Sequence, residues 1–149
     1  VFKVEGEVLL FYVSPESIDK TVIRYYTQGA KVNIELPMQP TGYLGGHYVL
    51  GHVDTTAVVT KIIPGDQAWF FTITVPEPFT KYVVYKGSVA INGVSLTINQ
   101  VVDQQIELCI IPITIEKTNM SLLKENDLVN VEFDILAKYT EQLLLKRDN

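Results

Sequence analysis

The sequence predicts an all-β protein, a barrel or a sandwich with a few short helices. Val, Ile, Thr, Tyr and Phe are frequent, and apolar residues alternate with polar ones along most of the chain, as in half-buried strands. Turn signals recur at intervals of about 8–12 residues, which is typical of barrels and sandwiches. With 149 residues and 47% apolar content, the chain is long enough to bury one good core.

The alternation predicts eight strands, at 8–13, 31–36, 47–62, 68–75, 88–91, 94–101, 105–111 and 128–136. A turn at 64–66 follows the third strand, and Asn92-Gly93 is a strong hairpin signal between 88–91 and 94–101. Helices are expected at 15–22, 76–86, 112–121 and 138–147. The first three begin at a proline, a residue favoured at helix starts.

The pattern Pro-x-x-Ile-acid-Lys-Thr occurs twice, at 15–21 and at 112–118, 97 residues apart. Between 12–35 and 109–132, 7 of 24 positions match at this offset, where chance gives roughly one or two. A repeat of this length fits two tandem domains of about a hundred residues each. Residues 38–97 have no counterpart before Val1, so we expect a fragment of a longer protein, with roughly sixty more residues at its front.

Composition argues against several partners. A formal charge of −5 and a pI near 5.0, without a cluster of Lys or Arg, argue against nucleic acid. The longest apolar runs are too short to cross a bilayer, so no membrane partner is expected. The single cysteine, Cys109, cannot form an internal disulfide, which suits a reducing compartment such as the cytoplasm. His47 and His52, the only histidines, lack cysteine partners, so no metal site is expected.

Strand alternation also predicts where a site can lie. Ile106, Leu108 and Ile110 share one face of their strand and should point into the core. The same rule makes Ser95 and Thr97 point outward, and it turns His52 away from the apolar face of its own segment. A site built from such residues lies on the outer wall, and a second barrel must cover it to make a closed pocket. We therefore expect the site at a domain or subunit interface.

Two ordered motifs carry a family resemblance. Residues 45–54 read Gly-Gly-His-Tyr-Val-Leu-Gly-His-Val-Asp, and residues 81–97 contain Tyr-Lys-Gly followed by Gly-Val-Ser-Leu-Thr. Together with the tandem repeat, these motifs make the chain resemble riboflavin synthase of the type with two lumazine-binding domains. The resemblance implies six-stranded Greek-key β-barrels, with 1–37 the closing part of a first lumazine-binding barrel, 38–136 a complete second barrel and 137–149 a C-terminal helix.

The resemblance also implies an activity. Riboflavin synthases convert two molecules of 6,7-dimethyl-8-ribityllumazine into riboflavin and 5-amino-6-(D-ribitylamino)uracil, by transfer of a four-carbon unit, without cofactor or metal. They are homotrimers whose substrates lie between the first barrel of one subunit and the second barrel of the next. The first barrel's Gly-x-Cys-Leu-Thr segment has no match in this sequence, and Cys109 aligns elsewhere. The chain by itself is therefore expected to bind ligand with little or no turnover.

By the same resemblance, the catalytic candidates are His52, Ser95 and Thr97, with His52 the candidate for proton transfer because the pKa of histidine suits that work. The substrate-binding candidates are Gly51, His52, Val53, Tyr82, Lys86, Ser95, Leu96, Thr97, Ile111, Pro112, Ile113, Thr114, Ile115 and Glu116, with Ser14, Glu16 and Ser17 from the first repeat.

Several alternatives stay open. His52 can be a histidine bonded at a barrel edge, Thr97 can reflect strand propensity alone, and Lys86 can be a solvated lysine at a strand end. At the level of the whole protein, the alternative to the enzyme is a non-catalytic antenna protein that carries lumazine or flavin. A structural barrel without a flavin ligand is the third hypothesis, and the density of motifs disfavours it.

Overall fold

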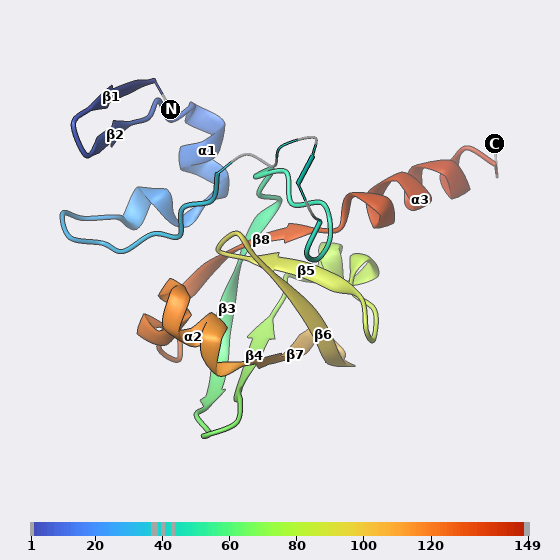
Figure 1. Ribbon diagram of the computed structural model, residues 1–149. Helices are drawn as coiled ribbons and strands as arrows, with labels where there is room; N and C mark the ends of the chain where they lie inside the picture. Colours follow the sequence, from blue (N-terminus) through green and yellow to red (C-terminus); the bar gives the residue numbers. More distant parts are fainter. Residues whose placement is uncertain (1, 37–38, 40, 43, 148–149) are drawn as a thin grey trace.

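Six strands close into one antiparallel barrel in the computed structural model, which confirms the all-β fold class (Figure 1). The model describes residues 2–36, 39, 41–42 and 44–147. The barrel strands are β3 (Thr55–Ile63), β4 (Trp69–Thr74), β5 (Ser88–Ile91), β6 (Val94–Val102), β7 (Gln105–Ile110) and β8 (Leu128–Phe133). Their order around the barrel is β3-β4-β7-β6-β5-β8. Because β5, β6 and β7 pair in sequence and β8 returns to lie beside β5, the connections form a Greek key.

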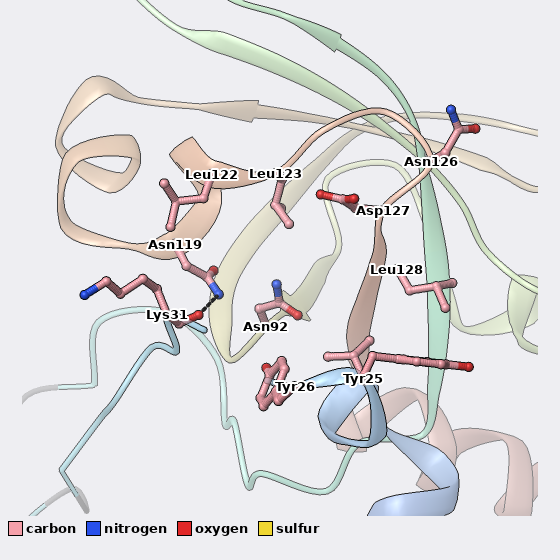
Figure 2. Close-up of a pocket in the computed structure, with 11 residues that line it drawn as sticks. Tyr25, Tyr26, Lys31, Asn92, Asn119, Leu122, Leu123, Asn126, Asp127 and Leu128 are labelled. Atoms are coloured by element: carbon pink, nitrogen blue, oxygen red, sulfur yellow. Dashed lines mark hydrogen bonds between the residues drawn. The ribbon is translucent and has the colours of Figure 1, made fainter. Parts of the chain in front are cut away.

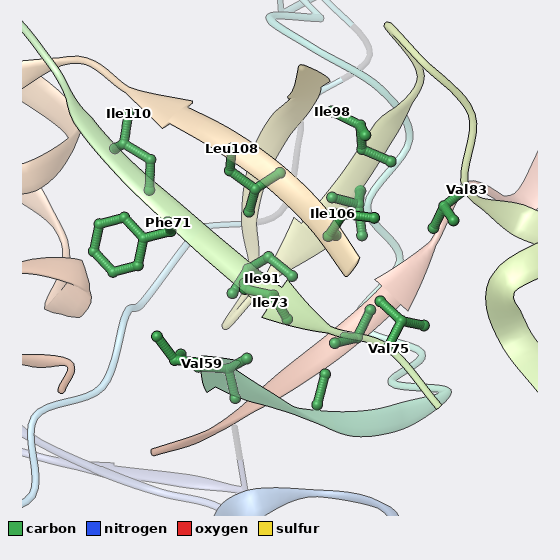
Figure 3. Close-up of a cluster of buried hydrophobic side chains, with 14 of the residues drawn as sticks. Val59, Phe71, Ile73, Val75, Val83, Ile91, Ile98, Ile106, Leu108 and Ile110 are labelled. Carbon is green, nitrogen blue, oxygen red and sulfur yellow. The ribbon is translucent and has the colours of Figure 1, made fainter. Parts of the chain in front are cut away.

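The barrel interior is filled by one cluster of aliphatic and aromatic side chains, drawn in Figure 3. Ile106, Leu108 and Ile110 of β7 are buried, as the alternation predicts, and they meet Phe71 and Ile73 from the neighbouring strand β4. Branched and aromatic residues suit this interior because they pack well on a pleated surface. The interior is therefore a packed core, and any ligand site lies outside it.

Several predicted strands are wrong in whole or in part. Residues 31–36 are irregular, because no described strand lies beside them to pair with their backbone. The predicted strand 47–62 begins only at Thr55, since Gly51 inside the predicted run takes a positive φ value of 74° that interrupts an extended backbone. The predicted strand 8–13 is shorter, as β2 (Val8–Leu10), and it pairs with β1 (Lys3–Glu5), a strand that the alternation missed.

The helices of the repeated pattern each divide in two. The first becomes α1 (Pro15–Lys20) followed by the 3-10 helix η1 (Val22–Tyr25), and the second becomes α2 (Pro112–Lys117) followed by η3 (Asn119–Leu122). Thr21 and Thr118 cause the breaks: each has extended backbone, and each hydroxyl accepts a hydrogen bond from the backbone N–H two residues further on. The same bonds at the same offset show that both copies fold alike locally.

The remaining helices differ from their predicted bounds. The segment predicted as a helix at 76–86 holds only η2 (Glu77–Tyr82), a 3-10 helix. Strand β8 ends at Phe133 instead of residue 136, and α3 (Ile135–Leu145) begins earlier than expected. The cause is Asp134, whose carboxylate accepts a hydrogen bond from the N–H of Leu136 and so caps the helix there.

Candidate functional site

A buried carboxylate holds the Gly-rich segment against the barrel. Glu132 alternates on β8 with the core residues Val131 and Phe133, so its side chain leaves the barrel on the outer face, yet it is only 5% exposed. Its two oxygens accept hydrogen bonds from the backbone N–H of Leu50, at 2.7 Å, and of Gly51, at 2.9 Å. A buried charge needs such donors, and these two fix the path of the chain just before His52.

The end of the same segment is held by a second carboxylate. Asp54 accepts a hydrogen bond from the N–H of Phe133, at 2.9 Å, and forms an ion pair with Lys138 of α3, at 2.6 Å. Both side chains are about one-fifth exposed, so water screens the pair only in part. The aspartate of the Gly-His-Val-Asp motif therefore joins the Gly-rich segment, β8 and the C-terminal helix.

The structure brings His47 to Ser95. The Nδ1 atom of His47 lies 2.8 Å from the hydroxyl oxygen of Ser95 on β6, so the imidazole orients that hydroxyl. Gly46 makes this approach possible, because a Cβ atom at Gly46 would stand 2.7 Å from the same oxygen. The other ring nitrogen of His47, Nε2, is buried and has no hydrogen-bond partner among the described residues. A polar atom left in this state is a candidate for contact with a ligand.

A groove of about 1410 Å³ lies at this pair. Its walls are the segment that precedes the barrel, the Gly-rich segment, the β5–β6 hairpin and the end of α2 with η3. Of the residues expected at the site, Gly51, Ser95 and Glu116 line it, and His47, Asn33, Asn92 and Asn119 line it as well. The groove is on the outer wall of the barrel, where strand alternation placed the site.

None of the other expected residues lines this groove, and they lie on several elements. Thr97 and Leu96 follow Ser95 on β6, with Thr97 exposed, and Lys86 is tied to β6 by a bond from its N–H to the carbonyl of Ile98, at 2.8 Å. Ile111, Pro112, Ile113, Thr114 and Glu116 follow β7 into α2, and Ile115 of the same run turns into the core, 9% exposed. His52 and Val53 follow Gly51, and the ring of His52 is exposed without a hydrogen-bond partner in the described part of the chain.

Three expected residues lie elsewhere. Ser14, Glu16 and Ser17 are on or next to α1, where Ser14 caps the helix by accepting from the N–H of Ser17, and none of the three lines the groove. Sequence reasoning missed His47, Glu132 and Asp54 as parts of the site. The signal for His47 was present in the Gly-Gly-His run, because two glycines before a histidine allow a close backbone approach.

Tyr82, expected to bind substrate, does not line the groove and helps to hold α3. Its hydroxyl and the ammonium of Lys81 both donate to the carboxylate of Glu141 on α3. These two hydrogen bonds lower the pKa of Glu141 below its usual value. The bond from Lys81 has the larger effect, and the bond from Tyr82 the next largest. The bond to Glu141 is also the main cause of the raised pKa of Tyr82. Helix α3 is therefore held by two charged side chains, Lys138, which pairs with Asp54, and Glu141, which accepts from Lys81 and Tyr82.

Two other kinds of feature are absent from the described residues. No group of three or more His, Cys, Asp or Glu is placed to hold a metal ion there. In the same residues, no helix has the length and apolar character needed to cross a membrane.

Comparison with known sequences matches residues 50–134 to the lumazine-binding domain. The chain is 40% identical over 145 residues to the riboflavin synthase of Photobacterium phosphoreum, covering 97% of this chain and 66% of that protein. It is 38% identical to the riboflavin synthase of Bacillus subtilis, covering 90% and 62%, and 33% identical to that of Mycobacterium bovis, covering 89% and 67%. The chain thus spans about two thirds of the length of these relatives.

Comparison with solved structures finds the same barrel. The structure of LumP complexed with 6,7-dimethyl-8-(1'-D-ribityl) lumazine aligns with a TM-score of 0.72 and 25% identity, covering 79% of this chain and 63% of that one. LumP complexed with riboflavin aligns with a TM-score of 0.70 and 24% identity, covering 79% and 64%. Fold, motifs and sequence identity agree, and the chain belongs to the lumazine-binding domain family, as a relative of the riboflavin synthases.

Proposed function

We propose that the chain is part of a riboflavin synthase and that its barrel binds 6,7-dimethyl-8-ribityllumazine on the outer wall around Ser95. One observation carries the proposal: the Ser95 hydroxyl, oriented by His47, opens into the groove at the position where the Ser-Leu-Thr motif lies on β6. The identity to several riboflavin synthases supports the same conclusion. The reaction combines two lumazines into riboflavin and 5-amino-6-(D-ribitylamino)uracil, and its atoms balance without an added oxidant or cofactor.

In this proposal, each residue has a role set by its position. The hydroxyls of Ser95 and Thr97 bind the edge of the pteridine ring, and His47 holds the Ser95 hydroxyl in one orientation. His52 moves a proton, which its exposed position permits, and the residues from Ile111 to Glu116 line the ribityl chain. Holding two flat rings in register supplies much of the rate, because the correct orientation of two bound reactants lowers the activation barrier by about 7–11 kcal/mol relative to free reactants.

The domain division belongs to the same proposal: residues 1–37 are the closing part of a first barrel, and 38–136 form the second. Burial supports it. Leu9, Phe11, Val13, Val32, Ile34 and Leu36 are between 38% and 83% exposed, whereas the residues 97 positions later are core residues at 0% or 1% exposure. These six apolar residues have the spacing of core residues but are exposed. We infer that another part of a barrel covers them.

We also propose that the complete protein is a homotrimer in the cytoplasm. Helix α3 turns its charged residues Lys138 and Glu141 to the barrel and leaves Leu136, Tyr139 and Leu143 more than 60% exposed. An apolar stripe of this kind suits contact between subunits. Sedimentation equilibrium of Leu143→Asp should show weaker self-association than Gln142→Asp, which adds the same charge beside the stripe. Equal association of the two variants would remove α3 from the interface.

The central test is a fluorescence titration of the chain with 6,7-dimethyl-8-ribityllumazine. Saturable binding is expected, and Ser95→Ala should raise Kd by about tenfold, the effect of one lost hydrogen bond of ~1.4 kcal/mol. Thr60→Ala, which removes an exposed hydroxyl on β3 away from the groove, should bind as the unchanged chain does. A chain that does not bind the lumazine at all would rule out both the enzyme and the carrier.

A second candidate function is a lumazine or flavin carrier without catalysis, favoured by the likeness to LumP in complex with these ligands. Riboflavin formation, followed by its visible absorbance, separates the two. This chain should bind and show little turnover. The full-length protein should produce riboflavin if it is the enzyme, whereas a carrier should bind the lumazine and leave it unchanged.

A further inference from the structure

Two asparagines, 97 residues apart, bind the two repeats to each other in a reciprocal way. The side-chain oxygen of Asn130 accepts from the N–H of Val22, at 2.8 Å, and the side-chain oxygen of Asn33 accepts from the N–H of Asn119, at 2.7 Å. Val22 and Asn119 are themselves the first residues of η1 and η3 and are also 97 residues apart. Each repeat thus caps the 3-10 helix of the other with the same residue at the same position, which is an approximate twofold contact.

A cavity of about 410 Å³ lies on this contact and shows the same symmetry. Figure 2 shows Tyr25 and Tyr26 on one side of it, and Leu122 and Leu123, which are 97 residues later, on the other. It also shows the bond from the Asn119 side chain to the carbonyl of Lys31, at 3.2 Å. The repeats therefore meet through matched segments, and the asparagine bonds are the polar part of that contact.

The two asparagines differ in what else they touch. The side-chain amide of Asn33 donates to the carbonyl of Asn92, at 2.9 Å, and to the side-chain oxygen of Asn119, at 3.0 Å. Asn92 is at the tip of the β5–β6 hairpin, three residues before Ser95, and Asn119 follows α2, three residues after Glu116. Both line the groove. Asn33 is also the one half-buried residue in the otherwise exposed run 31–36. The side-chain bond of Asn130 leads to Val22, which does not line the groove. Asn130 also contacts Asn92, but only through its backbone N–H and carbonyl, which the change to Ala keeps.

We propose that Asn33 is a positioning residue of the Ser95 groove. From the segment that precedes the barrel, it holds the β5–β6 hairpin and the start of η3 at a set spacing, and so fixes the two walls between which Ser95 and Glu116 lie. Asn33 acts through Asn92 and Asn119 and has no contact with Ser95. The consequence for binding rests on the proposed function, whereas the consequence for the geometry of the walls does not.

The test compares Asn33→Ala with Asn130→Ala, which remove the two reciprocal bonds. Amide hydrogen exchange should speed up by about tenfold at Asn119 in the first variant and at Val22 in the second, because each N–H loses its acceptor. The NMR signals of the His47 ring and the Ser95 amide should move only in Asn33→Ala. The Kd for 6,7-dimethyl-8-ribityllumazine should rise by about tenfold in Asn33→Ala and less than about twofold in Asn130→Ala.

Asn33→Asp is a second variant, in case Asn33→Ala fails to fold. It keeps the side-chain oxygen that accepts from the N–H of Asn119, but it replaces the donating NH2 group with an oxygen, so the bonds to Asn92 and to the Asn119 side chain are lost. Asn33→Asp should also shift the NMR signal of the Ser95 amide. Gln104→Glu, which makes the same charge change in an exposed turn, should leave that signal unchanged. Unchanged His47 and Ser95 signals in both Asn33 variants, or equal changes in Asn130→Ala, overturn the positioning role. If the unchanged chain fails to bind the lumazine, the proposed function is wrong, and the NMR comparison still decides the role of Asn33.

Discussion

Replacing Glu132 by Gln tests whether a buried carboxylate holds the Gly-rich segment on the barrel. In Glu132→Gln, one oxygen still accepts a backbone hydrogen bond, but the new NH2 group faces the other N–H, which loses its acceptor. Hydrogen bonds to charged groups contribute about 1.5–3 kcal/mol each, and an unpaired buried donor adds a cost. With one bond lost and the other weakened, the free energy of unfolding should fall by roughly 2–4 kcal/mol.

Thermal unfolding measures this directly, since about 1 kcal/mol moves Tm by roughly 2–4 °C in a chain of this size, so Tm should fall by roughly 4–16 °C. Glu125→Gln is the matched control: Glu125 also accepts from a backbone N–H, that of Ile62 at 3.1 Å, but it is exposed. That change should cost about 0.5 kcal/mol or less. Equal Tm values for the two variants would refute the argument that burial makes Glu132 important. Since Leu50 and Gly51 line the groove, Glu132→Gln should also weaken lumazine binding.

Three further predictions follow from the site and the core. Gly46→Ala should raise the Kd for the lumazine, because its Cβ would stand 2.7 Å from the Ser95 hydroxyl, whereas Gly45→Ala has nothing within 4 Å and should bind normally in the same titration. The lowered pKa of Glu141 means that its contribution to stability is present above its usual value of 4.5 and is lost as pH falls through the lower folded value. Urea unfolding should therefore show a smaller loss of stability below about pH 4.5 in Glu141→Gln than in the unchanged chain, and parallel curves would contradict this. Phe71→Ala should lower the free energy of unfolding in urea by about 3–5 kcal/mol, because the side chain is fully buried and leaves a cavity; a loss under 1 kcal/mol would show that the core is loosely packed.

The barrel strands were predictable because their pattern is local. Ile106, Leu108 and Ile110 alternate with polar residues, and Asn92-Gly93 turns the chain with positive φ values of 49° and 81°, so period and turn chemistry agree with the final fold. The failures at 31–36 and 47–54 have different causes. Alternation predicts that a segment can be a strand, but a strand also needs a neighbour, and residues 31–36 have none in the described structure. Within 47–54, the positive φ of Gly51 interrupts the extended backbone.

The site was predictable in part. Ser95 and Gly51 come to the groove as the motifs implied, and the outward direction of Ser95 follows from its place opposite the core residues of β6. His47 could not be assigned to Ser95 from the sequence, because 48 residues separate them and the bond depends on how the Gly-rich segment crosses the barrel. The role of His52 as proton carrier stays a prediction.

The order of residues alone determined the repeated pattern at 15–21 and 112–118, the alternation of the barrel strands, the turn at Asn92-Gly93 and the outward face of Ser95. All of these follow from backbone geometry over a few residues. Folding in three dimensions decided which distant groups meet: Glu132 with the N–H groups of Leu50 and Gly51, and Asn33 with Asn119. Such contacts depend on closing the barrel and docking a segment across it, because a hydrogen bond forms only when both partners are held within about 3 Å.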